Sequence, residues 1–334
     1  MSRSFNALAA ILGLLAMLSW AAPSSASSQK LSGRIAFILD PDVYTMKPDG
    51  SDLRQLTDFA PQGARARQPS WSHDGAQIVF HFFASRSAEP RLWIMNADGS
   101  NPHQVFDDPG FKDFSASFSP DNAQLAFSRC SDSCAIYRVG VDGSGLTAIT
   151  QFQPGTEIVD GHPAYSPDGK SIAFTSLNRG GILGATYLMN ADGTNIRRIT
   201  APAIGGQSAG WLPDGSRLAF SSHCCNPLNS VIWSMRTDGT DLEQVTEPGN
   251  LNDLGPWYSP DGDAIVFERD GPLFGTSAIF VKTLDGSAQR IFQGPRPGDM
   301  PADKHRSRRD ARRARALGII QNGGFSPQWG PAAD

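Results

Sequence analysis

Three aspartates stand at the same distance before an aromatic residue. Asp113, Asp160 and Asp253 each lie five positions before one: Phe118, Tyr165 and Tyr258 respectively. Oxygen ligands of this kind suit Ca²⁺, so one interpretation is a cation or ligand site in which the three carboxylates come together. The other is structural, with each aspartate capping backbone N–H groups of the turn that follows it.

Other side chains that could bind a ligand stand in irregular stretches. His162 follows Asp160 by two residues and either joins that site or is a solvated loop histidine. The remaining candidates for binding are His223, Arg65, Arg67 and Arg179. The chain has no His-Glu-x-x-His motif and no phosphate-binding Gly-rich loop after a strand, so we expect no cofactor apart from the candidate calcium ion.

Four cysteines favour an oxidising compartment. Cys130 and Cys134 flank three residues, and a disulfide across the mouth of a hairpin is predicted for them. Cys224 and Cys225 are adjacent, which leaves open a strained disulfide, two thiols or half of another bridge. Zinc is the weaker alternative because Cys-x3-Cys lacks a second pair at the usual spacing.

These candidates are carried by a unit that occurs six times. Each unit contains an Asp-Gly pair between apolar runs, which is typical of a tight turn because glycine adopts positive φ without steric cost. The glycines of these pairs are 49, 44, 50, 46 and 47 residues apart and stand at Gly50, Gly99, Gly143, Gly193, Gly239 and Gly286. A period of 40 to 50 residues with several strands in it is typical of a β-propeller.

Each unit is predicted to form four strands. The third strand has large apolar residues on both faces, as in the Leu92–Met95 segment, so each sheet must be covered on both sides. The first strand is missing from the first unit, and its counterpart, residues 325–330, stands at the far end (residues 299–303 are a weaker alternative). The sequence therefore predicts an all-β, six-bladed propeller over residues 31–330, with four-stranded antiparallel blades and a ring closed by the C-terminal strand, which completes blade 1.

The two ends of such a propeller differ. The Pro-Asp-Gly and Ala-Asp-Gly turns are short and alike and belong to one end. The loops of the other end differ greatly from unit to unit, and binding residues usually lie on irregular loops held by a rigid scaffold. We therefore expect a binding site on this variable loop face, centred on the mouth of the channel.

The chain ends suggest export and one insertion. Residues 1–26 have the Arg3, apolar core and small-residue cleavage site of a signal peptide, and the apolar run is too short to span a membrane. We expect a periplasmic or extracellular monomer that does not span the membrane. The basic segment 295–320 is either a solvated insertion or a contact for an anionic partner, and a net charge of -4 argues against a nucleic-acid partner.

The motifs of the fourth unit resemble those of a known family. Tyr165-Ser166-Pro167-Asp168-Gly169, Ile172-Ala173-Phe174 and Met189-Asn190-Ala191-Asp192-Gly193 are similar to the WD40-like PD40 repeats of TolB-type propellers. The resemblance covers residues 31–330 and implies a six-bladed periplasmic propeller, here without the N-terminal α/β domain of TolB. For function it implies binding of an envelope protein, as TolB binds a peptidoglycan-associated lipoprotein.

Two functions follow from these observations. The first is an exported, non-catalytic, TolB-like propeller that binds an envelope protein, a lipoprotein or a cell-wall polymer through the variable loop face. The alternative is an enzyme, a polysaccharide lyase or hydrolase with its site at the channel mouth. Carboxylates are common enough for paired acid–base chemistry, and their separation, which decides that reaction, cannot be obtained from the sequence.

Overall fold

The computed structural model describes residues 31–39, 41–151, 158–179, 184–223, 229–270, 277–286, 288–293 and 327–331. All of them lie in one compact unit that spans Leu31–Asp334. The predictions for the signal peptide, for Cys224 and Cys225 and for the basic segment 295–320 lie outside these residues. No helix in the described ranges has the length and apolar character needed to cross a membrane.

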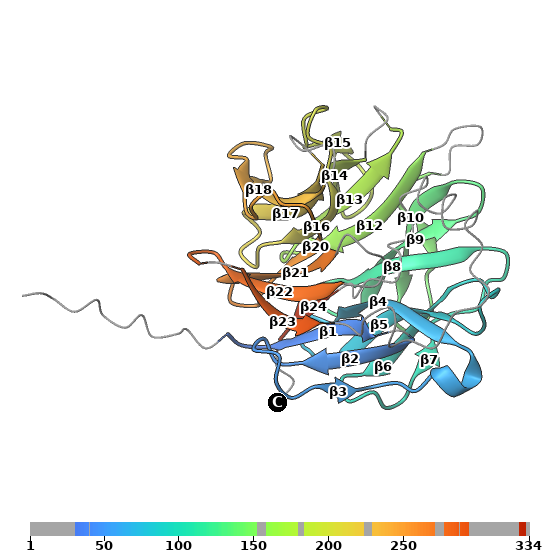
Figure 1. Cartoon of the computed structure of the whole chain (residues 1–334). Coiled ribbons are helices and arrows are strands. Elements are labelled where there is room, and N and C mark those ends of the chain that lie inside the picture. The colour runs from blue at the N-terminus through green and yellow to red at the C-terminus, as the bar shows by residue number, and fades with distance from the viewer. Residues whose placement is uncertain are drawn as a thin grey trace, which may run out of the picture. The chain divides into compact units, whose positions relative to one another are not determined.

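The described strands form five sheets, and four of these have four strands (Figure 1). The first contains β24 (Gln328–Gly330), β1 (Arg34–Leu39), β2 (Asp42–Met46) and β3 (Arg54–Gln55), and the short 3-10 helix Ala60–Gln62 follows β3. The second contains β4 (Arg65–Trp71), β5 (Gln77–Phe83), β6 (Arg91–Asn96) and β7 (His103–Gln104). Two more contain β16 (Gln207–Trp211), β17 (Arg217–Ser222), β18 (Val231–Arg236) and β19 (Glu243–Gln244), and β20 (Asn252–Tyr258), β21 (Ala264–Asp270), β22 (Ala278–Thr283) and β23 (Ala288–Gln293).

The fifth sheet differs from the prediction of six separate four-stranded sheets. It has eight strands: β8 (Lys112–Phe118), β9 (Gln124–Cys130), β10 (Cys134–Gly140), β11 (Thr147–Ala148), β12 (Val159–Tyr165), β13 (Ser171–Leu177), β14 (Ala185–Asn190) and β15 (Arg197–Arg198). Two of the predicted units are joined here by one parallel bridge, Cys134 to Val159. The all-β fold and the antiparallel pairing within each unit are confirmed.

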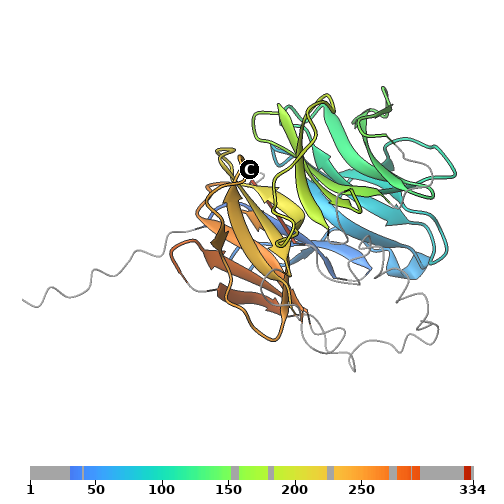
Figure 2. The same ribbon diagram turned by 90° about the horizontal axis from the view of Figure 1, so that it is seen from above.

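Each sheet is buried on both faces, as the apolar residues of the strands require. In β1, Ile35 and Phe37 pack against β21 and β22, whereas Ala36 and Ile38 pack against β5 and β6. The same phenylalanine recurs in the second strand of every unit and is at most 1% exposed: Phe37, Phe80, Phe127, Phe174, Phe220 and Phe267. Burial of each such side chain stabilises the fold by roughly 1.5–3 kcal/mol, and Figure 2 shows the sheets set side by side around a common centre.

The repeated turns are held by their own side chains. Ser166 Oγ donates to Asp168 Oδ1 at 2.6 Å and Lys170 N donates to the same oxygen at 3.0 Å. In the following turn, Gly193 has φ +86°, and a Cβ there would lie 2.4 Å from the carbonyl oxygen of Ile149 in the preceding unit. The aspartates and glycines of these turns therefore serve the fold.

Candidate functional site

The innermost strand of a sheet lines a central cavity, and five of these strands have a β-bulge at the same place. In each, two residues of the inner strand lie opposite one of its neighbour, as between Arg67 and Ser70 in β4. Each of these strands ends in an aromatic residue: Trp71, Phe118, Tyr165, Trp211 or Tyr258. The residue three positions before this aromatic residue has positive φ: Gln68 (46°), Ser115 (50°), His162 (52°), Ser208 (53°) and Gly255 (58°). We call these the bulge residues.

The bulges are anchored to the neighbouring unit through the backbone. The N–H groups of three bulge residues donate to hydroxyl groups on the second strand of the preceding unit: His162 to Ser128 Oγ (3.1 Å), Ser208 to Thr175 Oγ1 (3.0 Å) and Gly255 to Ser221 Oγ (3.0 Å). This hydrogen bond explains why the bulge recurs. It does not explain the side chains, because positive φ is least costly for glycine and costs other residues about 1 kcal/mol or more.

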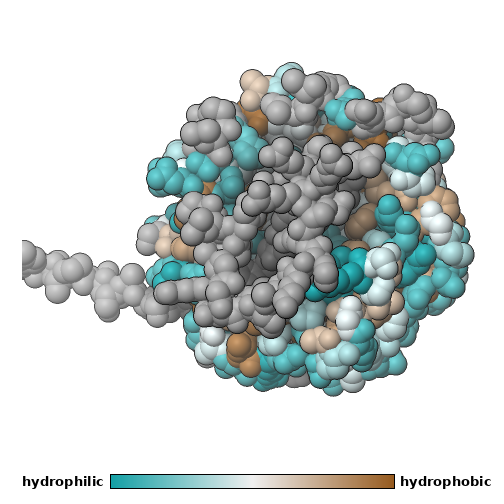
Figure 3. Space-filling model, turned by 45° about the vertical axis from the view of Figure 1, so that its right-hand side comes forward, coloured by the Kyte–Doolittle hydropathy of each residue, from teal (hydrophilic) through white to brown (hydrophobic). Residues whose placement is uncertain are grey.

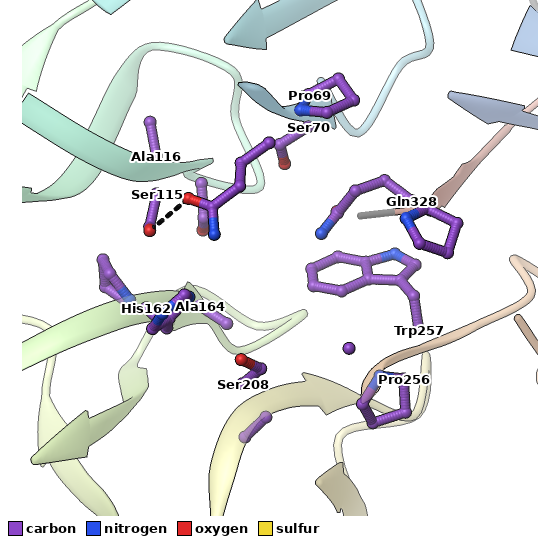
Figure 4. A pocket seen from close by; sticks show the side chains of 16 residues that line it. Pro69, Ser70, Ser115, Ala116, His162, Ala164, Ser208, Pro256, Trp257 and Gln328 are labelled. Atoms are coloured by element: carbon purple, nitrogen blue, oxygen red, sulfur yellow. Dashed lines mark hydrogen bonds between the residues drawn. The ribbon is translucent and has the colours of Figure 1, made fainter. Parts of the chain in front are cut away.

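The bulge residues and their neighbours enclose a cavity of about 570 Å³, counting the solvent at its mouth. In Figure 4, Ser115 Oγ donates to Gln68 Oε1 (2.6 Å), and the Trp257 ring and the Gln328 side chain extend toward the centre of the view. The Oε1 atom of Gln328 is buried and has no hydrogen-bond partner. The cavity therefore combines one aromatic side chain with several neutral polar groups.

The cavity is uncharged near neutral pH. Of the residues that line its described walls, His162 is the one with a titratable side chain. Burial lowers the pKa of His162 to about 4, because the imidazolium loses its hydration there. The pKa of the buried His81 nearby is also well below its usual value, because of burial first and then the positive charge of Arg67, His162 and Arg65.

The three predicted aspartates lie at equivalent places in β8, β12 and β20, and each is buried. Each binds an arginine. Asp113 accepts from Arg129 Nε at 2.8 Å, and Asp253 accepts from Arg269 Nε at 2.6 Å across the first two strands of their sheets. Asp160 accepts from Arg179 Nη2 and from Ser176 Oγ.

These ion pairs have marked electrostatic effects. Burial raises the pKa of the Asp113 carboxyl, and the hydrogen bonds from Arg129 only partly offset this. The pKa of Arg269 is raised, first by its hydrogen bonds to Asp253. Arg129 is 2% exposed and lies over the rings of four aromatic residues: Phe106, Phe111, Phe127 and Tyr137. Both arginines are thus firmly held at the loop end of their sheets.

The prediction of a cation site finds no cluster to support it. Within the described ranges no group of three or more His, Cys, Asp or Glu side chains could hold a metal ion. Each aspartate accepts hydrogen bonds from side chains, and the alternative in which it caps the backbone N–H groups of a turn stays a prediction. The calcium site itself stays a prediction.

The other candidates lie near the same end of the sheets but do not form one site. Arg65 and Arg67 lie in β4 and not in a loop; Arg65 stacks on Phe83 at 4.5 Å, and Arg67 Nη1 donates to the Ala66 carbonyl at 2.7 Å. His223 is exposed directly after β17. His162 lies inside β12 and not in a loop, because the bulge accommodates the Gly161-His162-Pro163 segment within the strand.

The structure places a disulfide between Cys130 and Cys134, which are direct neighbours across β9 and β10. A second cavity of about 370 Å³, again counting solvent, lies beside it. Its walls include Phe114, Val159 and Leu177 with the disulfide, and it shares Ser115 and His162 with the central cavity. This apolar slot thus opens beside the same bulge residues.

One motif match is explained by its setting. Residues 206–210 read Gly-Gln-Ser-Ala-Gly, which matches the Gly-x-Ser-x-Gly pattern of hydrolases that use a nucleophilic serine. That pattern places its serine on a strand-to-helix turn. Ser208 instead lies within β16, and in residues 201–223 the strand is followed by a turn and β17. The match therefore does not indicate a hydrolase nucleophile.

The cavity residues Gln68, Ser115, Ser208, Trp257 and Gln328 were not predicted. Their signal was available, because they stand one or three positions before the aromatic residue that ends each inner strand. A bulge adds one residue and turns the following side chains to the other face, so simple alternation assigns these residues wrongly. Alignment of the six units on the aromatic residue would have grouped them.

Antiparallel sheets set around a central cavity define this protein as a β-propeller. The PD40 family, the TolB beta propeller domain, matches residues 155–301. A stretch of 143 residues is 30% identical to the Tol-Pal system protein TolB of Nitratidesulfovibrio vulgaris, and it covers 42% of this chain and 29% of that protein. These matches support a TolB-type propeller.

Solved structures agree on the fold. TolB from Acinetobacter baumannii superposes with a TM-score of 0.68 at 19% identity over 91% of this chain and 68% of that one. A putative TolB from Agrobacterium tumefaciens gives 0.62 at 22% identity, with 79% and 89% coverage. An oligogalacturonate lyase from Vibrio parahaemolyticus gives 0.53 at 19% identity, with 77% and 74% coverage. Identities this low indicate a shared fold.

Proposed function

We propose that the chain is a closed, six-bladed propeller that is exported and binds an envelope protein through its variable loop face. Six blades are supported by the six sequence units and by the single residue pair that joins the two halves of the eight-stranded sheet. Closure is supported by the pairing of β24 with β1 and by the contacts of β24 with β4 and β20. Export to the periplasm or the extracellular space is supported by the similarity to TolB.

The observation that carries the binding proposal is where the buried ion pairs lie. Asp113–Arg129, Asp160–Arg179 and Asp253–Arg269 all join the start of an inner strand to the end of its neighbour or the loop just beyond. That is the end from which the dissimilar loops emerge. Rigid attachment lowers the entropy that a loop loses when a partner binds.

The surface is consistent with a polar partner interface. The described residues seen in Figure 3 are mostly hydrophilic, and the hydrophobic residues among them are scattered. The large hydrophobic residues exposed in the described part are Leu53, Leu146, Ile196 and Leu284, which lie at the turns of the opposite end. A transient, largely polar interface therefore fits the loop face better than a hydrophobic obligate one.

Nothing in the described part of the chain favours a hydrolase as the enzymatic alternative. The central cavity offers His162 as its titratable side chain, and the three carboxylates of the neighbouring strand ends bind arginines. A polysaccharide hydrolase needs two carboxyl groups on either side of one bond.

Paired variants test the proposal. In the first variant, arginine replaces Ser85, Ser87 and Ser131, which are exposed on the loop face. In the second, arginine replaces Leu53, Leu146 and Ile196, which are exposed at the opposite end. Both gain three positive charges. We expect the first to recover at least tenfold less of the envelope protein that the wild type captures from a periplasmic and membrane extract, and the second to match the wild type.

Three results would contradict the proposal. Equal losses in both variants would place binding elsewhere, and failure of the wild type to retain any envelope protein, including a peptidoglycan-associated lipoprotein, would remove it. Cleavage of a glycan by the wild type would favour the enzyme.

A further inference from the structure

The inner strands can be compared at the residue directly before their aromatic position. In four strands this residue is small: Ser70, Ser117, Ala164 and Gly210, and the first three of these line the central cavity. In β20 and β24, which lie next to each other, the same position holds Trp257 and Gln328. The cavity therefore has one side with large side chains and a remainder with small ones.

Strand β16 lies close to β20 beside the Trp257 ring. A Cβ on Gly210 would lie 2.6 Å from the backbone oxygen of Pro256 and 3.3 Å from Trp257 Cε3, so the neighbouring strand has no room for a side chain at this position. The bulge residue of the tryptophan's own strand is Gly255, which lines the cavity without a side chain. The other four bulge residues are not glycine, although glycine would suit their positive φ best.

The polar groups around this ring are neutral and not all satisfied. Gln328 Oε1 is buried without a partner. Gln68 Oε1 accepts from Ser115 Oγ, which directs the amide nitrogen of Gln68 to a different acceptor. Buried polar groups of folded proteins normally have partners, and each exception calls for an explanation such as a bound ligand or water.

We propose that the central cavity binds an uncharged saccharide, with one pyranose ring packed on Trp257 and its hydroxyl or acetamido groups bonded to Gln328, Gln68 and Ser208. A sugar ring has C–H groups on its faces that suit an indole surface, and polar groups on its rim that both donate and accept. Amide side chains also do both, which matches this rim.

The same lining argues against charged sugars. A uronate would bring a carboxylate into a cavity whose described walls hold no arginine or lysine, and an amino sugar cation would find no carboxylate there. Burial of either charge without a partner is costly. An apolar ligand would leave Gln328 Oε1 unsatisfied. Gln328, Gln68, Ser208 and Trp257 are not among the residues that the loop-face variants change.

Titration calorimetry of the protein expressed from its full coding sequence tests this inference. The probes are N,N′-diacetylchitobiose and cellobiose, with digalacturonate and the glucosamine dimer as charged counterparts. We expect a neutral disaccharide to bind with a Kd below about 1 mM, and Trp257→Leu and Gln328→Ala each to weaken it at least about tenfold. Gln124→Ala, a glutamine outside the cavity, is the matched control and keeps wild-type affinity.

Thermal unfolding of each variant shows whether it is folded. If Trp257→Leu is not folded, the affinity of Gln328→Ala alone tests the inference. The inference is overturned if neither neutral disaccharide binds, if the folded variants bind as the wild type does, or if digalacturonate binds as well as cellobiose. Because capture of an envelope protein uses other residues, this inference and the proposed function can fail separately.

Discussion

Protonation of His162 should destabilise the fold as the pH falls. The folded-state pKa is about 4, against 6.5 for an exposed imidazole, because the ring lies in the uncharged cavity. Below pH 6.5 the His162 imidazole binds a proton in the unfolded chain but not in the folded protein, so stability is lost as the pH falls from 6.5 toward 4. The full difference corresponds to about 3 kcal/mol, and about 2.5 kcal/mol of it is lost by pH 4.5.

The measurement compares urea unfolding at pH 7.5 and pH 4.5 for the wild type and His162→Asn. Asparagine suits the site because it tolerates the positive φ of residue 162 better than most residues. Other groups that titrate in this range and lie away from residue 162 are common to both proteins and cancel in the difference. His81 is the exception, because His162 contributes to lowering its pKa. We expect the variant to lose about 2.5 kcal/mol less than the wild type on acidification.

His103→Asn, on the exposed strand β7, is the matched control and should behave as the wild type. If the wild type and His162→Asn lost equal stability, His162 would accept its proton in the folded state at an ordinary pH. The cavity would then be hydrated well enough to hold a charge, and the reasoning from burial would be refuted.

Two further substitutions test what holds the frame. Asp113→Asn should lower the free energy of unfolding in urea by about 3 kcal/mol or more, because it removes a partner of the buried Arg129. The double variant Asp113→Leu, Arg129→Met should lose clearly less stability than the sum of the losses caused by these two changes made singly. Strict additivity would show that the pair is not coupled. Gly193→Ala should lower the stability by about 1–3 kcal/mol, since the residue has φ +86° and its Cβ would meet Ile149 O at 2.4 Å. The control Gly249→Ala should be nearly neutral, because no atom lies within 4 Å of the added Cβ. Equal effects of the two changes would rule out the steric argument.

The fold was accessible from the sequence because each unit repeats local signals. Turn aspartates, turn glycines and the buried phenylalanine recur at a fixed spacing, and each acts within a few residues of its position. The joining of two units into one sheet was not accessible. It rests on one parallel bridge between Cys134 and Val159, a contact between units that the local signals of each unit do not specify.

The site was predicted less well than the fold because its contacts cross between strands. The five-residue count identified Asp113 and Asp253 as equivalent, but their partners stand sixteen residues later, at Arg129 and Arg269. Recognising such a pair requires the register of two strands, which is fixed by the turn and by the bulge together. Composition and period contain neither.

The position of the three aspartates shows how a repeat separates folding from function. In two of the other units the equivalent residues are Ala66 and Gly206, and both are buried. Ala66 lies opposite Phe82, so an apolar pair occupies the place of an ion pair. A buried ion pair and a well-packed apolar pair of similar volume are often equally stable. The aspartates are thus one of two packing solutions, whereas Trp257 and Gln328, at a position that elsewhere holds only small residues, have no packing equivalent in the other units.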